Sequence, residues 1–187
     1  MRIISGIYKG RKLISPETKK VRPTSDRAKE TLFNILNNII DFEGMNCLDL
    51  FCGSGALGLE AVSRGANKCV FADRDVSVVL KNIAVLNAEE KCITFKGDAV
   101  NYITSVSEKF DLIFCDPPYD FDKYEEVITA ASNAGSFLAL EHSEKFVLNK
   151  EFEKFLTKLR SQRQLSESRS ESLQSKPVIL YQFLKSV

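Results

Sequence analysis

The chain has 187 residues, of which 44% are hydrophobic, so it can form one domain with a substantial core. No apolar run approaches the roughly 18 residues of a membrane span, and the first residues lack the apolar stretch of a signal peptide, so we expect a soluble, cytoplasmic protein without a membrane partner. The net charge of +1 conceals an asymmetry, because residues 1–24 carry seven Lys and Arg against one acid and the rest carries 19 against 24.

A basic N-terminal segment on a mildly acidic domain suggests a polyanionic partner, although a solvated surface hairpin is an equally good interpretation of charge alone. Residues 2–14 predict two short strands around a glycine-containing turn, followed by a basic loop. A helix capped within residues 24–26 then extends until residues 41–44. We therefore expect an N-terminal extension over residues 1–44 and a second domain over residues 45–187.

From residue 47 onward, strands and helices alternate. Strands are predicted at residues 47–51, 68–73, 92–96, 110–115 and 137–141, and helices at residues 57–64, 76–86 and 124–134, with a short helix before the fourth strand. This alternation predicts an α/β fold with a mostly parallel sheet covered by helices on both faces. Residues 161–175 are polar and serine-rich, and the apolar residues 178–183 after them predict a terminal hairpin.

The first strand leads into a glycine-rich loop and a helix. The segment from Leu48 to Gly58 reads LDLFCGSGALG, with its glycines spaced G-x-G-x-x-G. Dinucleotides and S-adenosylmethionine share this spacing, and a loop without a ligand is a further alternative. Asp49, beside the loop, suits the cationic end of a methionine moiety better than a pyrophosphate. The loop therefore favours S-adenosylmethionine.

Carboxylates also follow the next two strands. Asp73 ends the second strand, where it can accept hydrogen bonds from ribose hydroxyls, whereas Asp75 fits a helix cap. Asp98 follows the third strand and can accept the adenine amino group, with the Ala99 amide reaching a ring nitrogen; a helix cap explains Asp98 equally well. The residues expected to bind the cofactor are Asp49, Phe51, Gly53, Ser54, Gly55, Gly58, Asp73, Arg74, Asp98 and Ala99.

The sharpest motif is Asp116-Pro117-Pro118-Tyr119, directly after a hydrophobic strand. An exocyclic base amine is a poor nucleophile because its lone pair is delocalised into the ring. The Asp116 carboxylate and the Pro117 carbonyl can accept the two amine hydrogens, and Tyr119 can stack on a base that has left its helix. The tetrad is therefore the expected catalytic site, with a proline-rich turn as the alternative.

The five cysteines form no C-x-x-C pair and lie mostly in apolar segments, so buried free thiols are expected. The single histidine, His142, excludes a site with two histidine ligands. We expect no metal centre.

Together these residues resemble the RsmD family of bacterial 16S rRNA guanine-N2 methyltransferases. The tetrad is similar to the signature that adenine-N6 and guanine-N2 enzymes share, and the N-terminal residues narrow the resemblance to RsmD. The segments that carry the likeness are residues 2–6, 9–13, 22–27, 30–34 and 49–60, and the likeness extends to about residue 141. The polar segment without glycine at residues 161–175 departs from the family.

The resemblance implies a Rossmann-like class I methyltransferase with a seven-stranded sheet. It also implies methylation of guanine 966, in the numbering of the rRNA, by a monomer acting on a small-subunit assembly intermediate. The residues expected to contact the RNA are Lys9, Arg11, Lys12, Arg22, Thr24 and Arg27.

Three alternatives remain from the residues themselves. An adenine-N6 methyltransferase would use the same tetrad, but usually adds a target-recognition domain for which this chain is too short. A non-catalytic RNA-binding assembly protein would not need an intact tetrad and glycine loop. An NAD-dependent oxidoreductase leaves the tetrad unexplained.

Overall fold

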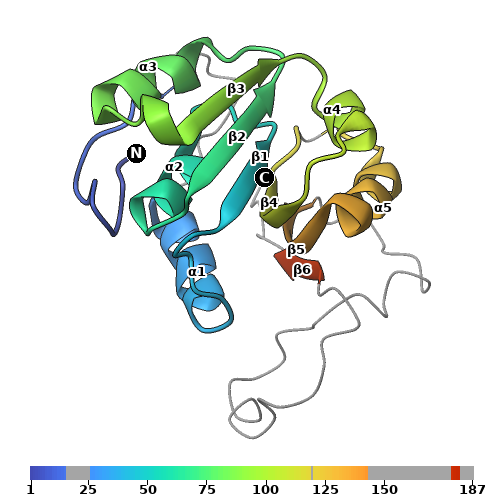
Figure 1. Ribbon diagram of the computed structural model, residues 1–187, viewed down its shortest axis with the longest axis horizontal. Coiled ribbons are helices and arrows are strands. Elements are labelled where there is room, and N and C mark those ends of the chain that lie inside the picture. Colours follow the sequence, from blue (N-terminus) through green and yellow to red (C-terminus); the bar gives the residue numbers. More distant parts are fainter. Residues whose placement is uncertain (16–25, 119, 143–177, 182–187) are drawn as a thin grey trace, which may run out of the picture.

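A computed structural model describes residues 1–15, 26–118, 120–142 and 178–181 (Figure 1). Its elements are, in chain order, α1 (Asp26–Asn37), β1 (Asn46–Leu50), α2 (Ala56–Ser63), β2 (Lys68–Asp73), α3 (Ser77–Leu86), a 3-10 turn (Glu89–Lys91), β3 (Cys92–Lys96), α4 (Ala99–Ser105), β4 (Phe110–Cys115), α5 (Tyr124–Ala134), β5 (Gly135–Glu141) and β6 (Val178–Tyr181). The strands form one sheet in the order β3-β2-β1-β4-β5-β6, and every neighbouring pair is parallel.

The predicted α/β fold with a parallel sheet is confirmed, and the predicted bounds of β2, β3, β4 and α5 agree with the structure. The number of strands differs, because the described residues contain six strands and not seven. At the C-terminal end, β6 pairs in parallel with β5. A hairpin partner for β6 would fall in residues 143–177 or 182–187, outside the described residues.

The N-terminal hairpin is not confirmed. In residues 1–15 a single antiparallel bridge joins Arg2 and Lys12, and three backbone hydrogen bonds join residues 1–3 to residues 10–13. Between these ends, the backbone amides of Ile4 and Ser5 donate to the Glu60 carboxylate in α2, at 2.8 and 2.9 Å. The pairing is thus limited to the ends of the segment, and a side chain of α2 accepts amides from its middle.

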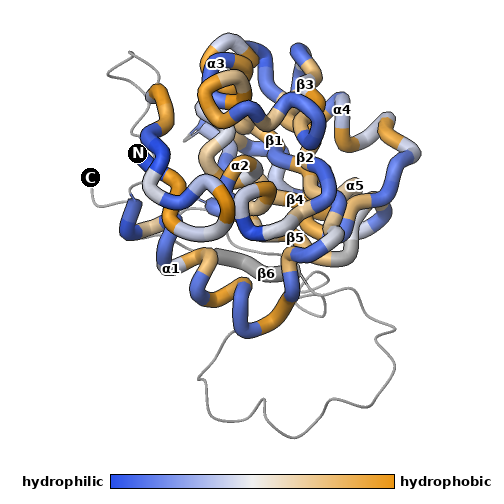
Figure 2. Tube along the Cα trace, turned by 60° about the vertical axis from the view of Figure 1, so that its left-hand side comes forward, coloured by the Kyte–Doolittle hydropathy of each residue, from blue (hydrophilic) through white to orange (hydrophobic). Residues whose placement is uncertain are grey.

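Helices cover both faces of the sheet because successive strand residues point to opposite sides. Cys47 packs in the core under α1, α2 and α3, whereas its neighbour Leu48 packs in the core under α4 and α5. The coils of α1 and α3 carry both hydrophobic and hydrophilic residues (Figure 2), as expected for helices with one buried face. Ile3, Leu13 and Phe33 belong to the first core, so the N-terminal extension shares its hydrophobic interior with the sheet.

Strand register determines which loops meet. Leu50 at the end of β1 pairs with Ala72 on one side and with Cys115 on the other. The segments after β1, β2 and β4 therefore leave the sheet side by side, at the carboxyl-terminal ends of these strands. There β1 lies between β2 and β4. Ligands of open α/β sheets bind at this kind of crossing point. Within the described part of the chain, no helix is long and apolar enough to cross a membrane.

Candidate active site

The loop after β1 has an unusual backbone. Phe51, Gly53 and Gly55 have φ of 57°, 51° and 74°, in the left-handed region that residues with a Cβ rarely adopt. A Cβ on Gly55 would lie 2.4 Å from the Cγ2 atom of Val79, so glycine permits the close contact with α3. A Cβ on Gly53 would meet only the Phe51 carbonyl oxygen, at 4.0 Å. The backbone of Gly53 therefore borders open space that a side chain would fill.

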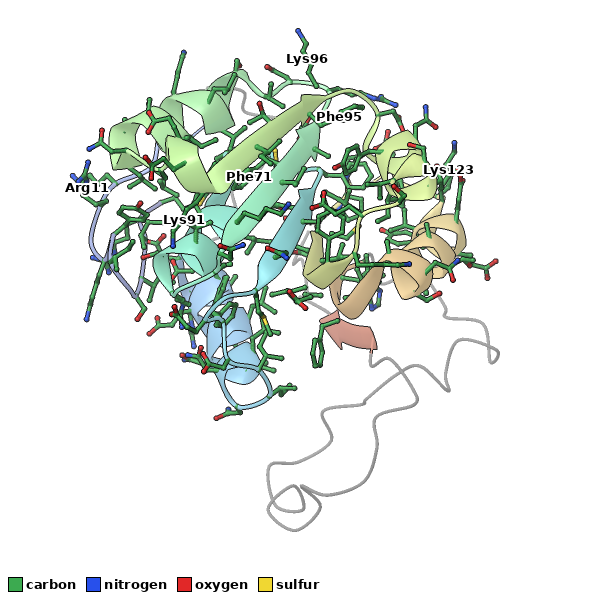
Figure 3. All side chains as sticks on the ribbon, in the orientation of Figure 1. Arg11, Phe71, Lys91, Phe95, Lys96 and Lys123 are labelled. Atoms are coloured by element: carbon green, nitrogen blue, oxygen red, sulfur yellow. The ribbon has the colours of Figure 1, made fainter. Side chains whose placement is uncertain are left out.

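Gly58 has a packing role. A Cβ there would lie 2.4 Å from the ring of Phe71 and 2.6 Å from the sulfur of Cys69, both on β2. Figure 3 labels Phe71 in the middle of the sheet. The third glycine of the motif thus lets α2 approach β2 closely, and the Gly58 amide donates to Asp49.

Asp49 is almost fully buried, with 2% of its surface exposed, and its Oδ2 atom accepts the Gly58 amide at 2.9 Å. Burial raises the pKa of Asp49 well above its usual value, the Gly58 hydrogen bond lowers it, and the charges of Asp116 and Asp73 raise it further. Three carboxylates thus act on one another at this edge. Their field favours a cationic ligand and opposes a pyrophosphate.

Asp73 connects β2 to the glycine loop. Its Oδ2 atom accepts the Gly53 amide at 2.9 Å and its Oδ1 atom accepts the Asp75 amide at 3.1 Å. Asp75 in turn accepts the Ser77 amide at 2.9 Å, although the cap residue of α3 is Val76 and not Asp75 as expected. Asp73 is consequently held beside the open backbone of Gly53.

Asp98 caps α4. Its Oδ1 atom accepts the amides of Val100 and Asn101, each at 3.0 Å, and its Oδ2 atom contacts the Arg74 guanidinium at 2.7 Å. The Arg74 hydrogen bond, followed by the Asn101 amide, lowers the pKa of Asp98. The cap interpretation is confirmed, and the contact of Asp98 and Ala99 with adenine stays a prediction.

Asp116 directly follows β4, and because Cys115 pairs with Leu50, it emerges next to the glycine loop. Pro117 is buried, Pro118 is exposed, and the Pro118 carbonyl accepts the Phe121 amide at 3.0 Å. Tyr119 lies outside the described residues. The structure therefore brings the start of the tetrad to the loop expected to hold the cofactor.

Sequence reasoning missed Phe121. Its ring centroid lies 5.1 Å from that of Phe51 and 5.0 Å from that of Tyr124, both in edge-on contacts. Phe121 thus joins the glycine loop to the segment after the tetrad. A lone aromatic residue between Asp120 and Asp122 gave no specific signal.

The expected RNA-contacting residues are partly described. Lys9, Arg11 and Lys12 are exposed in the N-terminal segment, and Arg27 is exposed on α1. The Arg11 guanidinium donates to the Val85 carbonyl of α3, and Figure 3 shows Arg11 at the outer edge of the molecule. Arg22 and Thr24 lie outside the described residues.

All five cysteines are free, and four of them are buried, which confirms the expectation of buried free thiols except at the partly exposed Cys92. Burial raises the pKa of Cys47 and Cys92 to about 12, so both stay protonated at neutral pH. In the described ranges no group of three or more His, Cys, Asp or Glu is arranged to hold a metal ion.

Comparisons with known proteins decide the family. The family described as conserved hypothetical protein 95 matches residues 1–178. Ribosomal RNA small subunit methyltransferase D of Escherichia coli K12 is 38% identical over 138 residues, which is 72% of this chain and 68% of the relative. The chain belongs to the RsmD family.

Two other RsmD-like proteins agree with this assignment. The YlbH protein of Bacillus subtilis is 35% identical over 159 residues, which is 79% of this chain and 85% of the relative. The solved structure of the putative methyltransferase yhhF of Escherichia coli matches with a TM-score of 0.67 at 34% identity. The match covers 80% of this chain and 86% of the yhhF chain. Membership in the RsmD family makes the chain a methyltransferase and supports S-adenosylmethionine as its cofactor.

The RsmD site fits this cofactor chemically. S-adenosylmethionine carries positive charge at its sulfonium and amino groups, and Asp73 and Asp116, whose charges reach Asp49, supply the opposite charge. The open space at Gly53 lets a ligand approach the backbone, and a side chain at this position would prevent that approach. Asp73, beside Gly53, offers the acceptor that a ribose requires.

Proposed function

We propose that this RsmD-family protein transfers a methyl group from S-adenosylmethionine to the exocyclic N2 amine of a guanine in 16S rRNA, of the guanine 966 type. It would act in the cytoplasm as a monomer on an assembly intermediate of the small subunit. The names of the Escherichia coli and Haemophilus influenzae relatives, both ribosomal RNA small subunit methyltransferase D, support the substrate class. The register of Leu50 with both Ala72 and Cys115 carries the proposal, because it brings the glycine loop and the tetrad together.

The cofactor supplies an electrophilic methyl group on a sulfonium. In the proposal, the Gly53 backbone borders it, Asp73 accepts hydrogen bonds from its ribose, and its positive charge favours the ionised form of Asp49 that burial disfavours. Gly55 and Gly58 act indirectly, by holding the loop against α3 and α2 against β2. The remaining proposed cofactor contacts are Phe51, Ser54, Arg74, Asp98 and Ala99.

Asp116 and the Pro117 carbonyl would hold the guanine amine. Each accepts one amine hydrogen, so that the nitrogen lone pair is directed at the methyl group, and catalysis comes mainly from positioning and from exclusion of water. Asp116 need not remove a proton beforehand, because the nitrogen loses its proton readily once it is methylated. Tyr119 would stack on the base after it has left its own helix.

Replacing Asp73 with alanine tests the cofactor assignment. The ribose would lose a charged acceptor and the Gly53 amide its partner, so affinity for S-adenosylhomocysteine should fall by about 1–3 kcal/mol in calorimetric titration. Asp75→Ala is the matched control: the Asp75 carboxylate accepts the Ser77 amide at the start of α3, and its loss should leave the affinity near that of the wild type. In the wild type, S-adenosylhomocysteine should raise the melting temperature and NAD should not; stabilisation by NAD alone would overturn the assignment.

A second variant tests the basic segment as the RNA contact. Replacing Arg11, Lys12 and Arg22 with alanine should weaken RNA binding and flatten its dependence on salt, by roughly 0.7–0.9 in log–log slope per lost phosphate contact. Cofactor affinity should not change. The control removes equal charge at Lys68, Lys109 and Lys123, which respectively contact Glu108, contact the end of α5 and directly precede α5; Figure 3 shows Lys123 on the side of the molecule away from Arg11. Equal slopes for the two triple variants would show that the segment is only a solvated surface.

A further inference from the structure

Asn82 joins the N-terminal segment to the glycine loop. Its side chain is fully buried in α3, with 0% of its surface exposed. The Oδ1 atom accepts the Ile14 amide at 2.7 Å, and the Nδ2 atom donates to the Ile14 carbonyl at 2.9 Å and to the Ser54 carbonyl at 2.8 Å. One side chain therefore bonds both backbone groups of Ile14 and the backbone of the loop between Gly53 and Gly55.

Few other residues could make this junction. Both Nδ2 hydrogens are used, so rotating the amide by half a turn would set its oxygen against the carbonyls of Ile14 and Ser54. Aspartate lacks the two donors, and leucine, of similar volume, lacks every polar atom. An apolar replacement would leave both backbone groups of Ile14 and the buried Ser54 carbonyl without this partner.

The junction connects the two regions that the proposed function uses. Ile14 follows the basic residues Arg11 and Lys12 in the chain. On the other side, Ser54 follows Gly53, whose amide donates to Asp73 at 2.9 Å. Hydrogen bonds of Asn82 and of the Gly53 amide thus connect the basic segment to Asp73, the carboxylate expected to bind ribose.

The other hydrogen bonds that anchor the segment lead elsewhere. Glu60 accepts two amides of the segment, and Ser63 accepts the Tyr8 amide at 3.0 Å, all on α2 and away from the loop. Among residues 1–15, one further side-chain hydrogen bond reaches the loop, from the Ser54 hydroxyl to the Met1 sulfur, and at 3.9 Å it is long and weak. Asn82 therefore provides the strong connection between segment and loop.

We propose that Asn82 is a positioning residue that couples cofactor binding to RNA binding, an inference that rests on the proposed function. A ligand bound against the loop restricts the Ser54 carbonyl and, through its hydrogen bond, the Asn82 side chain. Asn82 in turn orders Ile14 and the basic residues before it. RNA then binds a segment that has already lost part of its conformational freedom. The coupling is reciprocal, so RNA must tighten cofactor binding by the same factor.

Affinities measured in pairs test the coupling. Unmethylated small ribosomal subunits should bind the wild type about 5-fold or more tightly with saturating S-adenosylhomocysteine than without it, the lower end of typical couplings. In Asn82→Leu the ratio should fall to about 1. Ser63→Ala, the matched control, removes an anchor of the segment that does not reach the loop, so it should weaken binding equally in both conditions and keep the ratio. A wild-type ratio of 1, or an unchanged ratio in Asn82→Leu, overturns the proposal.

Hydrogen exchange in the wild-type protein gives an independent test should Asn82→Leu fail to fold. S-adenosylhomocysteine alone should slow exchange of the Ile14 amide, which Asn82 accepts, several-fold more than that of the Tyr8 amide, which Ser63 accepts. Equal protection of the two amides in the presence of bound ligand overturns the coupling and leaves the proposed function intact. Absence of S-adenosylhomocysteine binding overturns the proposed function, and the coupling with it.

Discussion

Replacing Asp116 with alanine should slow methyl transfer by about 10²-fold or more. The variant loses the carboxylate that accepts an amine hydrogen and orients the lone pair, and this is the scale for removing one preorganised polar contact from a transition state. Affinity for S-adenosylhomocysteine should stay within a few-fold, because the glycine loop and Asp73 are intact. Single-turnover rates with saturating cofactor and small subunits measure the effect.

The same loop offers controls. Asp120 is an exposed carboxylate just beyond the tetrad, and Asp120→Ala should keep nearly the wild-type rate. Tyr119→Phe should be almost silent, whereas Tyr119→Ala should weaken binding of the flipped base by roughly 1–3 kcal/mol if the ring stacks on it. Full activity in Asp116→Ala would refute the mechanism whatever the fold.

Replacing Glu60 with alanine should lower the free energy of unfolding by about 3–5 kcal/mol, the cost of breaking a buried ion pair from one side. Glu60 and Lys29 are both fully buried, and their charged atoms lie 3.1 Å apart. Burial lowers the pKa of Lys29, and Glu60 opposes that effect. The carboxylate also accepts the amides of Ile4 and Ser5 and the Arg64 guanidinium. Urea denaturation measures the loss.

Two variants separate buried charge from lost contacts. Glu108→Ala breaks the partly exposed pair with Lys68 and should cost below about 1 kcal/mol. Combining Lys29→Met with Glu60→Gln removes both charges and should recover much of the stability, because no buried lysine is left without its partner. A loss in Glu60→Ala no larger than in Glu108→Ala would contradict the buried ion pair.

Much of the fold could be predicted because the core strands are short apolar runs between clear turn signals. The strands β2, β3 and β4 and the helix α5 have the predicted bounds. The position of the glycine loop next to Asp116 also follows from sequence, since parallel strands place their carboxyl ends at one edge. Periodicity and turn chemistry are local, and they suffice for these elements.

The errors arise where distant contacts override local pattern. Residues 2–14 alternate like strands, but they pair only at their ends, and amides between them bond to Glu60 and Ser63 on α2, more than fifty residues away in sequence. Asn82 gave no signal, because one polar residue in an apolar helix does not reveal which backbone groups it faces. The glycine motif similarly does not distinguish Gly53, open to a ligand, from Gly58, packed against β2.

Transfer of tritiated methyl groups from S-adenosylmethionine to unmethylated small ribosomal subunits, followed by nucleoside analysis of the product, tests the central claim most directly. A methyltransferase in which Asp116 and the Pro117 carbonyl hold a guanine amine predicts that the label appears in N2-methylguanosine from 16S rRNA, and that Asp116→Ala nearly abolishes it. Label in N6-methyladenosine, or no transfer by a wild-type protein that binds the cofactor, would contradict the account.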